Sequence, residues 1–317
     1  MQELTSTRHN ELIDPLLHIW SWQIPVYLFI GGMVAGMMII SGYFILSGRL
    51  KEARCSCFYL PFFSLGLLSL GMLALFLDLE HKLFVWRFYT TFRITSPMSW
   101  GAWILILVYP ALILNLIIRL PKELYTRFPK LKEISKKISE HPYVVKNIGI
   151  LNMILGAMLG VYTGILLSTL IGRPLWNTSI LGILFLTSGL SSAAAFVHMI
   201  AKDTFERELL AKADNGFLTL EIIVVGMMII SLLTSNSAGH NAAHLLLDGQ
   251  YAAVFWVFVM GLGMFIPLII QLLAVNHKIQ HTPVAPIMVI VGGLILRFVL
   301  VYAGQASHWA EVTKLIK

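Results

Sequence analysis

The sequence predicts an all-α integral membrane protein with eight transmembrane helices, and three observations support this fold class. Of the 317 residues, 57% are hydrophobic and only 12% are charged, whereas about a quarter of the residues of a soluble domain are charged. Eight apolar stretches are each long enough to cross the bilayer core, which needs about 20 residues. These stretches are evenly apolar, whereas the strands of a membrane β-barrel alternate between apolar and polar residues.

Short polar connections separate the apolar stretches, and each stretch should be helical because hydrocarbon leaves the backbone no other hydrogen-bond partners. The expected spans are residues 24–47, 58–77, 98–119, 147–171, 179–200, 215–236, 251–275 and 284–304. Residues 1–14 lack the basic region and cleavage site of a signal peptide. We therefore expect the first span to direct membrane insertion without being cleaved.

The net charge of +7 is distributed unevenly between the two sides of the membrane. With eight spans, alternate connections lie on the same side of the membrane. The connections that precede the second, fourth, sixth and eighth spans contain 15 Lys and Arg residues, whereas the other side contains 7. The positive-inside rule places the more basic side in the cytoplasm, so both termini should face the periplasm. The charge therefore reflects topology and gives no indication of nucleic-acid binding.

Two polar connections have distinctive compositions. Residues 121–142 on the cytoplasmic side form a charged surface segment, which we interpret as a solvated loop that touches anionic lipid, with a surface helix as the alternative. Residues 78–96 on the outer side mix aromatic and basic residues, which predicts an amphipathic helix in the plane of the membrane. This second segment could serve either as an aromatic anchor or as a docking surface for another subunit.

Side chains able to bind metals are sparse. Cys55 and Cys57 are too few for an Fe–S cluster, which takes four thiolates. We interpret them as interfacial residues without a redox role, with redox or lipid-attachment functions as alternatives. His240 and His244 have the spacing of a metal-binding pair, but only Asp248 stands nearby as a third ligand, so we predict no metal site.

Histidines also argue against a b-type haem, which needs two axial ligands facing each other at the same membrane depth. His198 lies near the cytoplasmic end of its span, whereas His18 and His308 belong to the outer side. The spans offer no opposed pair, so we expect neither haem nor an Fe–S cluster in this protein.

Three ionisable residues lie within or at the start of the later spans. Asp214 and Glu221 open the predicted sixth span, seven residues apart and so on one helical face, and Arg297 lies inside the eighth. Charged groups at this depth are costly and commonly functional. They could form structural pairs that lock the helices together, or they could move protons.

A second polar group is expected at the outer ends of the first, second and fourth spans. Asp78 ends the second span, Tyr162 lies in the outer half of the fourth, and the first begins near His18 and Tyr27. A phenol, an imidazole and a carboxylate among indole rings suit a quinone head group, which needs hydrogen-bond donors, a proton relay and flat apolar walls. Simpler interpretations are a helix-end carboxylate and an interfacial histidine.

Several segments resemble the NrfD/PsrC family of quinone-interacting membrane subunits. They are PVYLFIGGMVAG (25–36), LDLEHKLFVWRFY (77–89), SPMSWGAW (96–103), GVYTGILLSTLIGRPLWNTSILGILFLTSGLSSAAA (160–195) and LRFVLVYAGQ (296–305). Together they cover most of residues 14–305. Length and layout are most similar to the membrane subunit of polysulfide reductase, although Glu80-His81 departs from the turn common in relatives.

The resemblance implies a haem-free anchor in the bacterial inner membrane, built as two four-helix bundles over residues 1–172 and 173–317. The first would bind menaquinone near the outer face, with Asp78 and Tyr162 in the pocket, and His18 and Tyr27 lining it. The implied partners are a four-cluster Fe–S subunit and, through it, a molybdopterin catalytic subunit. Asp214, Glu221 and Arg297 are the implied residues of proton movement.

The leading hypothesis is a subunit that oxidises menaquinol at the periplasmic side and passes the electrons to an Fe–S subunit, for reduction of polysulfide or a related sulfur compound. Three alternatives stay open: a quinone-reducing anchor of a hydrogenase- or formate-dehydrogenase-type complex, a proton-translocating subunit, and a stand-alone transporter. The protein alone should not be a complete enzyme.

Overall fold

The computed structural model describes residues 20–49, 58–119, 129–170, 172–276 and 282–308. Within these ranges eight helices are long and apolar enough to cross a membrane, as predicted. Their bounds are α1 (Gln23–Leu46), α2 (Leu60–Asp78), α4 (Pro97–Ile118), α7 (Pro142–Ser168), α8 (Ile180–Ile200), α9 (Thr204–Leu233), the continuous pair η4 (Val254–Phe265) and α11 (Ile266–Val275), and α12 (Val284–Ala306). The first half of the seventh span, η4, is a π-helix.

Local sequence signals explain where most of these helices begin. Proline occupies the first turn of α2, α4 and α7, where its missing N–H costs no hydrogen bond. The predicted start of the sixth span at residue 215 is wrong, because α9 begins at Thr204 with Asp203 as its N-cap. The charged residues before 215 form the first turns of this helix, so Asp214 lies well inside it.

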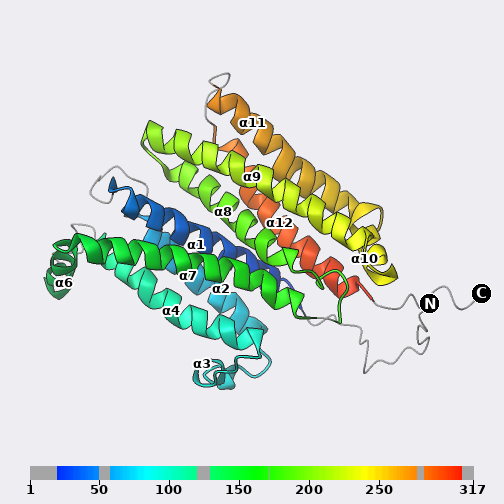
Figure 1. Cartoon of the computed structure of the whole chain (residues 1–317), viewed down its shortest axis with the longest axis horizontal. Helices are drawn as coiled ribbons and strands as arrows, with labels where there is room; N and C mark the ends of the chain where they lie inside the picture. The colour runs from blue at the N-terminus through cyan, green and yellow to red at the C-terminus, as the bar shows by residue number, and fades with distance from the viewer. Residues whose placement is uncertain (1–19, 50–57, 120–128, 171, 277–281, 309–317) are drawn as a thin grey trace, which may run out of the picture.

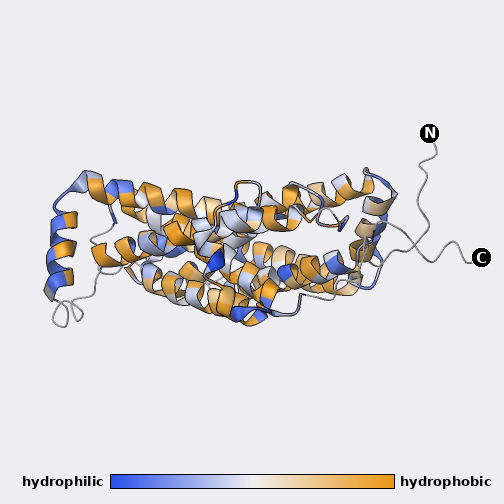
Figure 2. Cartoon of the chain, turned by 90° about the horizontal axis from the view of Figure 1, so that it is seen from below, coloured by the Kyte–Doolittle hydropathy of each residue, from blue (hydrophilic) through white to orange (hydrophobic). Residues whose placement is uncertain are grey.

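The two polar connections differ from each other in structure. The segment 121–142 was interpreted as a solvated loop, but part of it is helical, forming α6 (Pro129–Ser139), which lies across the end of the helix assembly with its lysines exposed (Figure 2). The outer one was predicted as a single amphipathic helix, and this is wrong. It contains only two short pieces, η3 (Lys82–Phe84) and α3 (Arg87–Thr90). Its aromatic side chains are nevertheless largely exposed.

The helix α1 lies at the centre of the assembly. It packs on α2 and α7 from the first half of the sequence and on α8 and α12 from the second half (Figure 1). Because α7 also packs on α8, the two halves share one continuous interior. The all-helical, multi-pass architecture is confirmed, whereas the division into two four-helix bundles stays a prediction. Figure 1 also shows α6 at one end of the long helices and α3 and α10 (Ser237–Leu247) at the other.

Glycines allow α1 and α8 to approach each other closely. A Cβ atom added at Gly36 would lie 2.6 Å from the backbone oxygen of Gly189, and one added at Gly189 would overlap the backbone of Gly32. In a bilayer, where lipid tails are as apolar as the helices, such close backbone packing is a main source of helix association.

We predict that Gly189→Ala lowers the thermal stability of the protein, at an overpacking cost of about 1–3 kcal/mol. Unfolding in detergent, followed by circular dichroism, measures the effect. The matched control is Gly226→Ala on α9, where an added Cβ would meet no atom within 4 Å. Equal melting temperatures for the two variants would contradict the close packing of α1 on α8.

Candidate functional site

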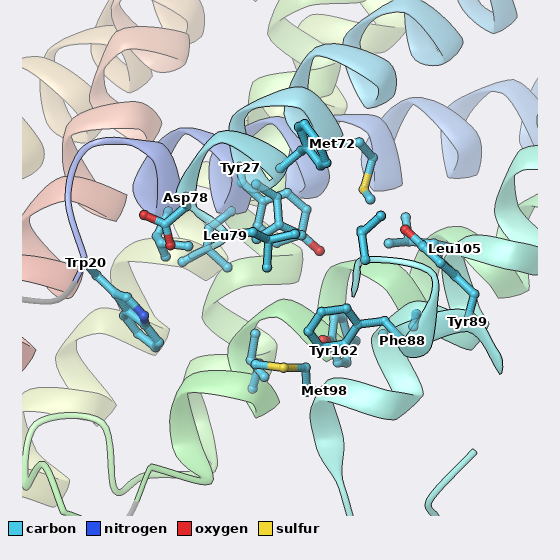
Figure 3. A pocket seen from close by; sticks show the side chains of 18 of the residues that line it. Trp20, Tyr27, Met72, Asp78, Leu79, Phe88, Tyr89, Met98, Leu105 and Tyr162 are labelled. Carbon is cyan, nitrogen blue, oxygen red and sulfur yellow. The ribbon is translucent and has the colours of Figure 1, made fainter. Parts of the chain in front are cut away.

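A cavity of about 180 Å³ lies among those ends of α1, α2, α4 and α7 that are next to the connection following α2 (Figure 3). Its walls are mainly apolar, and its polar side chains are few. Such a combination is typical of small-molecule sites, in which a few polar groups orient a ligand among hydrophobic walls. The polar and aromatic lining residues are Trp20, Tyr27, Phe76, Asp78, Phe88, Tyr89 and Tyr162.

Two of the lining phenols come from neighbouring helices in the interior. Tyr27 of α1 is 4% exposed and Tyr162 of α7 is 5% exposed. Neither hydroxyl has a hydrogen-bond partner among the described residues. A buried hydroxyl normally finds a partner. These two are therefore available to a ligand that fills the cavity.

Gly101 of α4 creates the space that Tyr162 occupies. A Cβ atom at position 101 would overlap the phenol ring of Tyr162, so any larger residue must displace it. Gly101 also lines the cavity itself. The absence of a side chain at Gly101 therefore leaves the space in which the Tyr162 ring lies.

Asp78 is the only carboxylate among the described residues that line the cavity. It is the last residue of α2 and is partly exposed, and it forms no ion pair with any described residue. In Figure 3 its side chain lies on the same side of the cavity as Trp20, opposite Tyr89. Asp78 is therefore accessible both from the cavity and from the surface of the protein.

Tyr89 of α3 completes the polar lining from the outer connection. Burial raises the pKa of Tyr89 above its ordinary value, with a smaller contribution from Tyr109. The phenol therefore stays protonated at neutral pH and can donate a hydrogen bond into the cavity.

The structure brings together three of the four residues predicted for the quinone pocket, namely Tyr27, Asp78 and Tyr162. The fourth, His18, lies outside the described residues, as do Cys55 and Cys57. Of the indoles near the start of the first span, Trp20 lines the cavity, whereas Trp22 is 51% exposed and does not. The assigned roles of these residues stay predictions.

The sequence reasoning missed the wall that α4 contributes. Met98, Gly101, Ala102 and Leu105 all line the cavity, but the predicted pocket included only the first, second and fourth spans. The available signal was the segment SPMSWGAW, whose small residues occur where a bulky neighbour must fit.

A second polar site lies inside the later helices, around Asp214 of α9. Its side chain is fully buried, yet both of its carboxylate oxygens have partners. Oδ1 accepts a hydrogen bond of 2.6 Å from the Ser191 hydroxyl of α8, and Oδ2 accepts one of 2.7 Å from the Gln271 amide of α11. Asp214 therefore joins three helices through charge-assisted hydrogen bonds.

Glu221 and Arg297 lie in the same buried region. Glu221 is 3% exposed and lies seven residues after Asp214 on the same face of α9, near Ser188 of α8 and Arg297. Arg297 of α12 donates 3.0 Å to the backbone oxygen of Phe185 and stacks 4.0 Å above the Phe185 ring. The three predicted proton-transfer residues thus form one buried cluster, to which α8 adds a row of serines.

The histidine pair on α10 gains one partner in the structure. The Nδ1 atom of His244 lies 2.9 Å from the Asp248 carboxylate, and the rings of His240 and His244 are 4.7 Å apart. Within the described residues no group of three or more potential metal ligands occurs.

The comparison with protein families identifies the relatives of this protein. The model of the family described as "Polysulphide reductase, NrfD" matches residues 6–308. The chain belongs to the NrfD family. Three curated relatives match along nearly their whole length. Because the family match accompanies eight apolar helices, this is a multi-pass membrane protein.

The NrfD relatives come from three bacteria. The Escherichia coli protein NrfD is 30% identical over 324 residues, covering 96% of the sequence described here and 98% of the relative. The Haemophilus influenzae protein NrfD homolog is 29% identical, covering 91% and 95%. The C subunit of polysulfide reductase from Wolinella succinogenes is 28% identical, covering 90% and 94%.

We predict that Gly101→Ala displaces Tyr162 and lowers the affinity of the cavity for a small aromatic ligand by about tenfold, because the new methyl group occupies the position of the ring. Quenching of tryptophan fluorescence by menadione, with the detergent-solubilised protein, measures the affinity. The control is Gly66→Ala on α2, where an added Cβ would meet nothing within 4 Å. The same dissociation constant for both variants would contradict the packing of Tyr162 on Gly101.

Proposed function

We propose that this protein is the membrane subunit of a respiratory molybdopterin/Fe–S oxidoreductase and that it oxidises menaquinol in the cavity formed by α1, α2, α4 and α7. The observation that carries the proposal is the cavity itself, in which two buried phenols and one carboxylate face apolar walls beneath the outer surface. Family membership and the similarity to the C subunit of polysulfide reductase support a subunit of a respiratory reductase.

The lining matches the chemistry of a naphthoquinol head group. Its flat ring requires apolar and aromatic walls, such as those provided by Phe88, Met98 and Leu105. Its two oxygens require hydrogen-bond partners, which Tyr27 and Tyr162 supply from adjacent helices. The polyisoprenoid tail can lie along the exposed apolar faces of α2 and α4, which contact each other only sparsely.

Oxidation of menaquinol releases two electrons and two protons, and the products need separate routes. Asp78 takes the two hydroxyl protons of the quinol one after the other and passes each to the outer aqueous phase before the next is transferred. Tyr162, assisted by His18, hydrogen-bonds the quinol oxygens and fixes the ring. The electrons leave to an Fe–S cluster on a partner subunit, and through it to a molybdopterin subunit that reduces polysulfide or a related sulfur compound.

Proton translocation is a second candidate function, favoured by the buried cluster of Asp214, Glu221 and Arg297. Asp214 accepts hydrogen bonds from Ser191 and Gln271, while Glu221 and Arg297 are buried nearby, with Arg297 donating to the backbone oxygen of Phe185. Such residues mark proton relays in many membrane proteins. In this interpretation the later helices carry protons across the membrane while the cavity oxidises quinol.

We predict that Asp78→Asn reduces menadiol oxidation by the purified complex by about 100-fold or more, because general-base catalysis commonly contributes that much. The subunits should still copurify, since Asp78 forms no ion pair with described residues. Asp248→Asn, which alters an exposed carboxylate on the outer side, is the matched control and should retain full activity. Normal turnover in Asp78→Asn would remove this residue from the mechanism.

We predict that Glu221→Gln abolishes any proton movement beyond that of the quinol itself, because the amide cannot carry a proton. The measurement uses proteoliposomes with an internal pH-sensitive dye, driven by menadiol. Menadiol oxidation should continue in the variant, and Glu208→Gln, an exposed change on the same helix, should behave like the wild type. A wild-type protein that moves no protons beyond the quinol stoichiometry would refute translocation.

A further inference from the structure

The first described residue, Trp20, is held by the last transmembrane helix. The amide side chain of Gln305, near the end of α12, forms two hydrogen bonds with the backbone of Trp20. Its Oε1 accepts from the Trp20 N–H at 3.1 Å, and its Nε2 donates to the Trp20 carbonyl at 3.0 Å. Gln305 is 6% exposed. This reciprocal pair fixes the position and the direction of the backbone just before α1 begins.

A second contact fixes the indole of Trp20. Its ring stacks on the ring of Trp176, with centroids 5.2 Å apart and planes 30° from parallel. Trp176 comes from the connection between α7 and α8, and it is 2% exposed. Its indole N–H donates 2.8 Å to the backbone oxygen of Leu300, and its ring lies against Gly304, where a Cβ would overlap it. The Trp176 ring therefore cannot shift without moving α12.

The connection that carries Trp176 is itself tied to the end of α12. Arg173 is buried, and its Nη1 donates 2.9 Å to the backbone oxygen of Ser307. The backbone N–H of Leu175 donates 3.3 Å to the Ser307 hydroxyl. Trp20, Trp176 and Gln305 are thus parts of one arrangement, here called the outer clamp, which is anchored on α12.

The outer clamp matters because Trp20 forms part of the cavity wall. It lines the cavity together with Asp78, on the same side in Figure 3, and α1 brings Tyr27 into the same cavity seven residues further on. A backbone held by two hydrogen bonds and a ring held by stacking present a pre-formed wall to the ligand, which lowers the entropic cost of binding.

We propose that Gln305 and Trp176 are positioning residues for the quinone cavity, acting through Trp20. This inference rests on the proposed function. It gives the second half of the sequence a part in binding the quinone, although neither Gln305 nor Trp176 lines the cavity. It also links the cavity to the helix of Arg297, because Gln305, which holds Trp20, lies eight residues after Arg297 on α12, about 12 Å along the axis.

The test compares Gln305→Leu with the wild type in the intact complex. We expect menadione, followed by tryptophan fluorescence quenching, to bind about tenfold more weakly to the variant, because two hydrogen bonds to the Trp20 backbone are lost. The KM for menadiol should rise by a similar factor while kcat stays within about twofold, since the groups that contact the quinol oxygens are unchanged.

Changes at Trp176 separate ring stacking from general stability. Trp176→Phe keeps a ring against Trp20 and should bind menadione nearly as the wild type does. Trp176→Leu removes the ring and should weaken binding about tenfold. Thr169→Ala is the control for a change near this connection that does not affect Trp20. The Thr169 hydroxyl donates only to the backbone oxygen of Leu166, so this variant should bind menadione as the wild type does.

The outcomes distinguish this inference from the proposed function. If the wild-type complex fails to bind menadione, the quinone cavity itself is refuted. If the wild type binds it, and Gln305→Leu and Trp176→Leu bind it equally well, the positioning role is refuted while the cavity stands. A loss of kcat with an unchanged KM in Gln305→Leu would also overturn the positioning role.

Discussion

The close packing of α1 against α8 is the constraint on which the rest of the structure depends. Because Gly32, Gly36 and Gly189 carry no side chains, the two backbones approach closely enough for α1 to lie between the helices of both halves. The central position of α1 gives it access to both polar sites. Tyr27 faces the cavity, and five residues later Gly32 lies beside the guanidinium of Arg297, which a Cβ there would approach to 3.5 Å.

The bilayer explains why polar groups gather at these two sites. A polar group in hydrocarbon is costly unless it is paired, so it must face a partner, a cavity or water. Asp214 illustrates the first solution, since both of its oxygens accept hydrogen bonds. Asp78 illustrates the second solution, because its side chain lines the cavity at the end of α2. The two proposed roles differ accordingly: a paired relay for Asp214 in the interior and a proton acceptor for Asp78 at the cavity.

The sequence predicted the eight spans because apolar length is a strong signal, and it failed where that signal weakens. The start of α9 was placed 11 residues late because its first turns carry charges, as in residues 204–214. The position of a residue along its span gives its depth in the membrane, and this was enough to group Tyr27, Asp78 and Tyr162. Depth does not reveal which helices are neighbours, so the wall from α4, including Gly101, was missed.

Contacts between distant segments were equally beyond sequence reasoning. Gln305 and Trp20 are 285 positions apart, and the hydrogen bonds between them depend on α12 packing beside α1. The segment LRFVLVYAGQ drew attention to Arg297, but nothing in it indicated that Gln305 holds the start of the first span. Through the outer clamp, the last span holds Trp20, one wall residue of a cavity that the first four spans line.

Photoaffinity labelling of the intact complex with an azido-naphthoquinone, followed by peptide mapping, tests the central claim most directly. If the cavity binds quinone, the label should attach to segments 20–28, 72–89, 98–105 and 162–167, and excess menaquinone should prevent it. Labelling that excess menaquinone does not displace, or that falls on the exposed apolar face of α9, would show that the cavity is not the quinone site.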